Sequence, residues 1–379
     1  MGVIYADNAA TTRLSDTAFD AMKPYMLNEY GNASTLYKLG RSAHKAVETA
    51  RGVFAKGINA LPAEIYFTSG GTESDNWAIK GTAHRLAGSG KKHIVTDNIE
   101  HHAVLNSAKA LEREGFEVTC VSAEKNGIVR AEDITAAIRP DTALVSVMFA
   151  NNELGTIQPV AEIGSICRSE GVLFHCDAVQ AAGILPIDVK QMNIDLLSMS
   201  AHKFHGPKGV GIMYARRGCA PETYIDGGEQ ERGHRAGTEN VAGIVGAAAA
   251  FAEAISERNE KTDRLCAMRD EIQSGLLKIP GSQVNGVTAP RLPGTLNMSF
   301  DGIDGQSLIF ELDLKGLAAS SGSACASGSV GPSHVLLALG LPYKLAHGSL
   351  RLSLGRYNTP DEAEMIVRIV SDTVAELRG

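Results

Sequence analysis

The chain is poor in cysteine: its 379 residues include six, and none of them form a Cys-x-x-Cys pair. A disulfide framework is therefore not expected, and this usage is typical of a reducing, cytoplasmic compartment. The N-terminus lacks a basic stretch followed by an apolar run, so we expect no secretory signal peptide. The most apolar run, residues 241–252, is too short to span a bilayer, and no membrane association is predicted.

Several charge and ligand-binding signatures are also missing. Lys and Arg total 36 against 43 Asp and Glu, and this formal net charge of −7 argues against nucleic acid as the main partner. No Gly-x-Gly-x-x-Gly follows the first predicted strand, and Arg85 and Lys92 break any P-loop around Lys91. The Glu100-His101-His102 run lacks the spacing of a zinc-binding helix, so no metal site is predicted.

Short β-rich runs alternate with helical stretches over the first two thirds of the chain. Strands are expected at 65–68, 93–96, 117–121, 143–149, 173–176 and 196–199, and helices near 103–114, 132–138 and 160–170. This alternation predicts an α/β fold with a mostly parallel sheet covered on both faces. Such sheets bind ligands beyond the carboxyl ends of their strands, so polar residues at those ends are the candidates for a site.

The amino-acid composition of the chain changes from about residue 238. No proline lies between Pro221 and Pro280, and the stretch is rich in Ala and Glu, which predicts one long helix or a helix pair. We expect it to link a large domain to a smaller C-terminal one, with a boundary near residue 255. The last third then alternates again, with strands near 296–299 and 350–354 and helices near 305–313 and after 360.

Ser200-Ala201-His202-Lys203 carries the sharpest chemical signal. It follows the predicted strand 196–199 directly, which puts Lys203 at an edge of the sheet. A lysine there is either only solvated or partly desolvated, and a desolvated amine readily forms a Schiff base with an aldehyde. Ser200 and His202 add two donors for a phosphate, so together the motif suits a phosphorylated aldehyde.

Two other strand ends carry polar groups that allow alternative interpretations. Thr72 either only caps a helix or, with Gly71, forms an anion site where that helix starts. Asp177 either caps the next helix or pairs with a cationic ring nitrogen, which would be costly to bury alone. The second interpretation of Asp177 suits pyridoxal phosphate, because its protonated pyridine is an electron sink.

The remaining candidates are less specific one by one. Asn152 lies in a turn or donates to a ring oxygen, and His101 packs inertly or stacks on an aromatic ring. Arg351 alternates with leucines on a predicted strand, and its guanidinium suits either a surface ion pair or a substrate carboxylate. Cys325 is the one thiol in a run of small residues, 320–329, which predicts a loop, and an exposed loop thiol is a liability unless it is used.

Taken together, these motifs resemble the cysteine desulfurases of the nitrogen-fixation and iron–sulfur-assembly type, within the class V aminotransferases. The resemblance implies the fold type I of pyridoxal-phosphate enzymes (aspartate aminotransferase-like), with a large domain at 16–255 and a small α/β domain at 1–15 and 256–379. It also implies a homodimer. The motifs that carry it, in chain order, are 7–12 (DNAATT), 68–74 (TSGGTES), 100–101 (EH), 151–153 (NNE), 177–180 (DAVQ), 200–203 (SAHK), 235–238 (RAGT) and 321–325 (SGSAC).

The resemblance also implies a role for each matching residue. Lys203 would carry the cofactor covalently, Asp177 would pair with its ring nitrogen, and His101 would stack on the ring and shuttle a proton. Arg351 and Asn32 would receive the substrate carboxylate, and Cys325 would accept the sulfur. The residues assigned to pyridoxal 5′-phosphate are Gly71, Thr72, His101, Asn152, Asp177, Gln180, Ser200, His202, Lys203 and, from the other subunit, Thr238.

The activity that the resemblance implies is removal of sulfur from L-cysteine, leaving L-alanine and a persulfide on Cys325. An iron–sulfur scaffold protein is the implied acceptor of that sulfur. A selenocysteine lyase or an aminotransferase on the same fold is the alternative. A non-catalytic cluster carrier is disfavoured, because cluster ligands come closely spaced and these cysteines are scattered.

Overall fold

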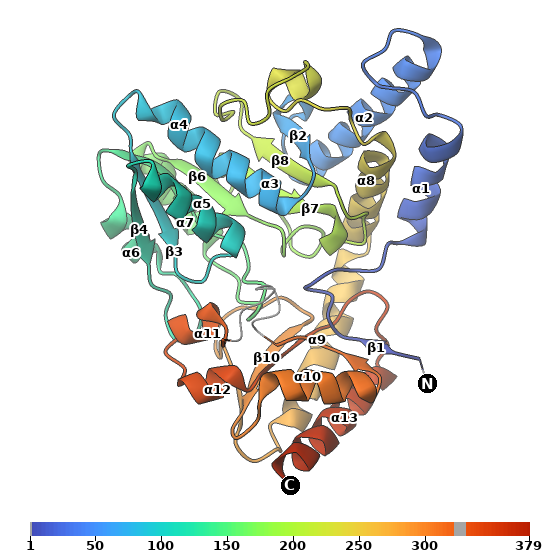
Figure 1. The fold of residues 1–379 in the computed structure, drawn as a ribbon, viewed down its shortest axis with the longest axis vertical. Coiled ribbons are helices and arrows are strands. Elements are labelled where there is room, and N and C mark those ends of the chain that lie inside the picture. The colour runs from blue at the N-terminus through green and yellow to red at the C-terminus, as the bar shows by residue number, and fades with distance from the viewer. Residues whose placement is uncertain (1, 322–330) are drawn as a thin grey trace.

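A computed structural model describes residues 2–321 and 331–379 of the chain. Figure 1 shows a larger body built on one sheet and a smaller body formed by the C-terminal third. The N-terminal segment runs from the smaller body to the larger one. None of the helices in the described ranges combines the length and apolar character needed to cross a bilayer.

The larger body is organised on a seven-stranded sheet in which, among its described strands, β8 alone runs opposite to the other six. The prediction of a mostly parallel sheet is thereby confirmed, and β8 is the strand that the sequence did not predict. In spatial order the strands are β2 (Ile65–Thr68), β8 (Gly211–Ala215), β7 (Leu196–Ser200), β6 (Leu173–Asp177), β5 (Thr142–Ser146), β3 (His93–Asp97) and β4 (Glu117–Val121).

Both faces of this sheet are buried, because successive side chains of a strand point to opposite faces and both sets are apolar. On β2, for example, Tyr66 joins one buried apolar cluster and Phe67 the other. Helices cover both clusters (Figure 1). They are α3 (Gly71–Asn76), α4 (Thr82–Ala87) and α5 (His102–Arg113) on the Tyr66 side, and α1 (Asp16–Leu27), α2 (Lys38–Gly57), α6 (Ala131–Ala137), α7 (Val160–Glu170) and α8 (Val241–Ser256) on the Phe67 side.

The smaller body has an apolar cluster of its own beneath an antiparallel sheet, β12 (Ser349–Ser353), β10 (Thr295–Phe300) and β9 (Ser282–Val284). The helix pair predicted after residue 238 is α8 followed by α9 (Arg258–Leu276). The first strand, β1 (Ile4–Tyr5), pairs with β11 (Leu317–Ala318), so Ile4 and Ala6 belong to this cluster. The other helices are α10 (Gly305–Leu314), α11 (His334–Ala338), α12 (Tyr343–His347) and α13 (Asp361–Arg378).

Short helical turns complete the chain between these elements. The most relevant is η3 (Ala201–Lys203), a 3-10 turn that follows β7 and carries Lys203 off the edge of the sheet. The others are η1 (Pro62–Glu64), the π-helical segment η2 (Trp77–Gly81) between α3 and α4, and η4 (Gln230–Gly233).

Candidate active site

A cavity of about 300 Å³ lies beyond the carboxyl ends of the parallel strands. Nine of the ten residues predicted to bind the cofactor line it, and Thr238 does not. These nine come from five separate places in the sequence, which the parallel topology brings to one edge. The lining residues are Ala9, Gly71, Thr72, Asp75, His101, Met148, Ala150, Asn152, Asp177, Val179, Gln180, Ser200, His202 and Lys203.

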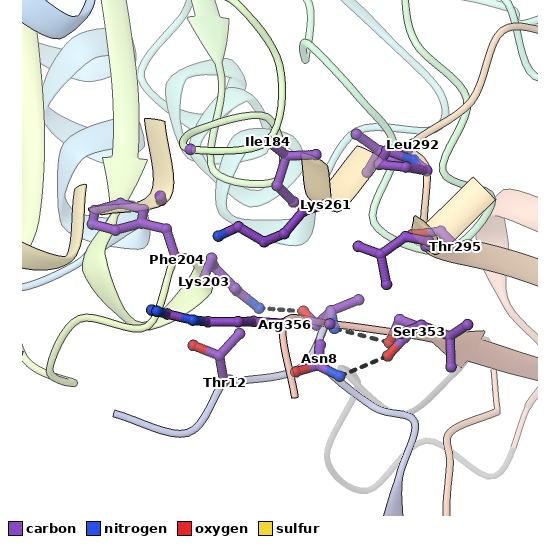
Figure 2. A pocket seen from close by; sticks show the side chains of 18 of the residues that line it. Asn8, Thr12, Ile184, Lys203, Phe204, Lys261, Leu292, Thr295, Ser353 and Arg356 are labelled. Atoms are coloured by element: carbon purple, nitrogen blue, oxygen red, sulfur yellow. Dashed lines mark hydrogen bonds between the residues drawn. The ribbon is translucent and has the colours of Figure 1, made fainter. Parts of the chain in front are cut away.

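The Lys203 amine rests on the N-terminal segment of the chain. Its Nζ donates hydrogen bonds to the carbonyl oxygens of Ala9, at 2.5 Å, and Ala10, at 2.8 Å. The Ala9 carbonyl also accepts from Nε2 of Gln180 at 3.1 Å. A second cavity, shown in Figure 2, meets the first at Lys203 and reaches toward α9. Lys203 therefore lines both cavities.

Asp177 and Asp75 form an acidic wall on one side of the larger cavity. Both side chains are buried, at 6% and 1% exposure, and burial raises the pKa of Asp177 to about 6. The pKa of Asp75 is raised further, first by burial and then by the charge of Asp177. One oxygen of Asp75 has no hydrogen-bond partner among the described residues, and the backbone N–H of Val179 donates to Asp177 at 2.9 Å. This acidic wall suits a cationic ring group. Without such a cation, Asp75 and Asp177 lie too close together for both carboxyls to be ionised.

A buried histidine lies behind the acidic wall. His175 of β6 is fully buried, and its two ring nitrogens lie 2.8 Å from Oγ of Ser146 and 3.0 Å from Oγ of Ser198. Its Nε2 is also 3.6 Å from Asp75. Burial lowers the pKa of His175 to about 3, so this ring is neutral and brings no positive charge to the acidic wall.

More acidic groups are buried next to these. Glu100 and Asp97 have no exposed surface, and within residues 2–321 and 331–379 both Glu100 oxygens lack hydrogen-bond partners. Burial raises the pKa of Asp97 to about 7, and the pKa of Glu100 is raised by burial and by the charges of Asp97, Asp177 and Asp75. Burial thus favours the protonated form of both carboxyls, and Glu100 lies immediately before His101 in the chain.

Two histidines on the cavity wall are neutral. Burial and the neighbouring Lys203 lower the pKa of His101 and of His202, each to about 4. Nδ1 of His101 accepts the backbone N–H of Ala103 at 3.1 Å and so caps α5. A neutral ring that accepts at Nδ1 carries its proton on Nε2, so His101 offers a donor rather than a charge.

The end of the cavity around Gly71 and Thr72 collects neutral donors. Thr72 and Ser200 contribute hydroxyls, and His202 contributes an imidazole whose Nδ1 lies 3.1 Å from Oγ1 of Thr11. Glycine is required at position 71, because a Cβ there would lie 2.6 Å from Cγ2 of Val179. Hydroxyls, an imidazole N–H and a helix start are the donor set that a phosphate group prefers.

The residue set of the cavity fits pyridoxal phosphate at each end of that molecule. An orphaned, buried acidic oxygen on Asp75 and the Asp177 carboxylate suit a protonated ring nitrogen, and the Thr72 end suits the phosphate. Lys203 lines the same cavity, where its amine would meet the aldehyde.

The residues predicted for the substrate and the sulfur are placed differently. Arg351 on β12 is 1% exposed and donates to the Asn152 carbonyl at 3.0 Å, so it lies directly behind the cavity wall. Asn32 and Thr238 are exposed and line neither this cavity nor the one in Figure 2. Cys325 lies outside the described residues. The roles of these four residues stay predictions.

Sequence reasoning missed three acidic residues that belong to this region. Asp75 lies one helical turn after Gly71 on the buried side of α3, and Glu100 directly precedes His101. Glu153 follows Asn152, is 4% exposed, and accepts a hydrogen bond from Ser333, the N-cap of α11. Nothing local in the sequence separates Glu100 or Glu153 from surface acids, and the same holds for Asp75, which lies in the polar run 72–76.

Comparison with known proteins agrees with this geometry. The Aminotransferase class-V family matches residues 4–366. The chain belongs to the class-V aminotransferase family. Within this family it groups with the cysteine desulfurases: it is 50% identical over 376 residues to Cysteine desulfurase IscS of Methanosarcina thermophila, covering 99% of this chain and 93% of that protein. It is 48% identical over 378 residues to the protein of the same name from Clostridium botulinum strain Hall, covering 99% of this chain and 95% of that protein.

Solved structures give the same result for the fold. A NifS-like protein superposes with a TM-score of 0.93 at 39% identity, covering 99% of this chain and all of that one. The structure of SspA in complex with cysteine superposes with a TM-score of 0.82 at 35% identity, over 94% of this chain and 100% of that one. The expected fold type I is therefore confirmed for this class-V aminotransferase.

Proposed function

We propose that the chain is a pyridoxal-phosphate-dependent cysteine desulfurase that converts L-cysteine to L-alanine and transfers the sulfur to Cys325. The observation that carries the proposal is the convergence of nine predicted cofactor residues, Lys203 among them, on one cavity whose lining combines buried carboxyls with neutral hydrogen-bond donors. The names of full-length relatives support the same activity. The similar structure of SspA, which is in complex with cysteine, supports the same substrate.

Each group of the cavity has a defined task in this reaction. When bound, pyridoxal phosphate supplies an electron sink that makes the Cα proton of the substrate acidic. Asp177 holds the negative charge that keeps the ring nitrogen protonated, and Thr72, Ser200 and His202 bind the phosphate. Lys203 takes the Cα proton at Nζ once the substrate amine has replaced it, and His101 donates or accepts a proton at Nε2 near the substrate thiol.

Sulfur transfer then needs only one nucleophile. The Cys325 thiolate attacks the substrate sulfur, a new S–S bond forms as the bond between sulfur and the substrate Cβ breaks, and the carbon skeleton leaves as alanine after protonation. The electron pair of the broken bond stays with the carbon skeleton, so no outside oxidant is required. Arg351, with Asn32, holds the substrate carboxylate during these steps.

The wider assignments belong to the same proposal. The protein acts as a homodimer in which Thr238 of each subunit completes the phosphate site of the other. Its domains are 16–255 and the combination of 1–15 with 256–379. It works in the cytoplasm and passes the Cys325 persulfide to an iron–sulfur scaffold protein.

The test is to incubate the purified, pyridoxal-phosphate-loaded protein with L-cysteine and to quantify alanine and sulfide. Native protein should form the two in equal amounts under reducing conditions, and Cys325→Ala should form neither above background. Cys120→Ser, at an exposed cysteine, is the matched control and should retain full activity. Formation of pyruvate or glutamate, or full activity of Cys325→Ala, would instead favour an aminotransferase or a selenocysteine lyase.

A further inference from the structure

Each terminal nitrogen of the Arg351 guanidinium donates a hydrogen bond to another part of the chain. Nη2 donates to Oδ1 of Asp7 at 2.7 Å, and Nη1 donates to the carbonyl of Asn152 at 3.0 Å. The Arg351 side chain is 1% exposed, and its Nε is buried without a partner in the part of the chain that the structure describes. A carboxylate that reaches Arg351 therefore meets terminal nitrogens that each already have one acceptor, and on Nη2 that acceptor is a carboxylate.

Asp7 is the more accessible partner of this ion pair. Its side chain is 18% exposed, against 1% for Arg351. Its backbone is fixed independently of the carboxylate, because Ala10 N–H and the Tyr5 hydroxyl donate to the Asp7 carbonyl at 3.0 and 3.1 Å. The carboxylate can thus leave Arg351 for water while the N-terminal segment stays in place.

We propose that Asp7 is a specificity-determining residue that occupies the carboxylate position on Arg351 in the resting enzyme and is displaced by the carboxylate of the substrate. The proposal rests on the proposed function, in which Arg351 receives that carboxylate. It adds that every amino-acid ligand must exchange one buried ion pair for another. Asp7 thereby weakens the binding of amino acids, and of the product alanine in particular, which favours product release.

The physical reason is the cost of an unpaired buried charge. A guanidinium that loses its carboxylate partner in the protein interior is strongly destabilised. An Asp7→Asn substitution removes that partner, so the free enzyme is left with an uncompensated Arg351 that a ligand carboxylate can neutralise. Ligands that carry a carboxylate should consequently bind the variant more tightly, whereas ligands without one should not distinguish the two proteins.

The experiment measures ligand binding to the pyridoxal-phosphate-loaded enzyme by the change in its visible absorbance. L-Alanine and ethylamine are compared, because ethylamine is alanine without its carboxylate. We expect Asp7→Asn to bind L-alanine at least about tenfold more tightly than the native enzyme, a change of about 1.4 kcal/mol, and to bind ethylamine with unchanged affinity. Asp16→Asn, at an exposed ion pair with Arg13, is the matched control and should change neither affinity.

Two results would overturn the proposal. One is that Asp7→Asn binds L-alanine no more tightly than the native enzyme, which would mean that Asp7 supports Arg351 and does not compete for it. The other is an equal change for ethylamine, which would show a general effect on the site. The same measurements are repeated in a Glu153→Gln background, because the Glu153 carboxyl also interacts electrostatically with Arg351 and must not replace the lost charge.

Failure of the proposed function has a different signature. A native enzyme that forms no alanine from cysteine would refute desulfuration, while the contrast between alanine and ethylamine would still report on Asp7. If Asp7→Asn does not fold, a crystal structure of the native enzyme with L-alanine decides. A ligand carboxylate on Arg351 Nη2 supports the proposal, and a persisting bond from Nη2 to Asp7 overturns it.

Discussion

The Nζ atom of Lys203 lies 2.5 Å from the carbonyl oxygen of Ala9, although 194 residues separate the two in the sequence. The N-terminal segment is therefore part of the site wall. The segment also reaches Ser353 on β12, through hydrogen bonds from the Asn8 side chain and the Ala9 backbone (Figure 2). One short stretch thus links the lysine on the large sheet to the strand that carries Arg351.

The charge on Asp177 should dominate cofactor affinity. Asp177→Asn removes the partner of the cationic ring nitrogen, and loss of one partner of a buried ion pair costs about 3–5 kcal/mol, which weakens pyridoxal-phosphate binding roughly 100-fold or more. The measurement is the equilibrium dissociation constant of pyridoxal phosphate from the apoprotein.

The matched control for this prediction is Asp75→Asn in the same cavity. Burial, and then the charge of Asp177, raise the pKa of Asp75 well above its ordinary value, which favours the neutral carboxyl, so an amide changes the charge of the cavity less here than at Asp177. The dissociation constant of pyridoxal phosphate from the Asp75→Asn variant should stay within about threefold of the native value. Equal weakening by both substitutions would contradict the assignment of the charge to Asp177 alone.

His101 should titrate far below an ordinary histidine. Burial, with the charges of Lys203, His102 and His334, lowers its pKa to about 4. The carbon-bound ring protons of His101 in the apoprotein, assigned by comparison with His101→Gln, should shift with a midpoint near that value in an NMR titration. A midpoint near 6.5, the value of a solvated imidazole, would contradict a neutral donor at this position.

Glu153 should make the folded protein less stable as pH rises. Burial raises its pKa from 4.5 to about 7, so the unfolded chain loses this proton at lower pH than the folded one. Its contribution to the free energy of unfolding is complete below about pH 4.5. As pH rises from there toward 7, the free energy of unfolding falls by up to about 3 kcal/mol.

Glu153→Gln removes that dependence. Urea unfolding at several pH values should show the variant gaining stability relative to the native protein as pH rises. Glu260→Gln, at an exposed position, is the control and should run parallel to the native protein. A Glu153→Gln curve that is also parallel would contradict the raised pKa.

Ser333 holds the start of α11 and should be important for stability. Its hydroxyl accepts the N–H groups of Val335, at 3.1 Å, and Leu336, at 3.3 Å, and also bonds to Glu153. Ser333→Ala should lower the free energy of unfolding by about 1–3 kcal/mol through loss of the cap and of the buried bond. The control Ser165→Ala, at an exposed position, should lower the free energy of unfolding by less than about 0.5 kcal/mol. An equal loss in the two variants would contradict a stabilising role for the Ser333 cap.

Much of the site was predictable because it follows from strand ends. Lys203, Asp177 and Asn152 come directly after β-rich runs, and parallel strands bring their carboxyl ends to one edge. Local pattern is enough to locate such residues.

Features that depend on distant pairing were not predictable in this way. β8 follows a glycine-rich loop and gives a short apolar run with no alternation, because both of its faces are buried between β2 and β7. The contact between Asp7 and Arg351 joins residues that are 344 positions apart, and the alternation around Arg351 indicated a second face of β12 without showing that this face is buried too.

The most direct test of the whole account is to locate the covalent attachment of the cofactor. The loaded protein is reduced with borohydride and digested, and the pyridoxyl-labelled peptide is identified by mass spectrometry, with exposed Lys208 in the same segment as an internal comparison. The account predicts a label on Lys203 and none on Lys208. A label elsewhere, or a fully labelled Lys203→Ala variant, would contradict it.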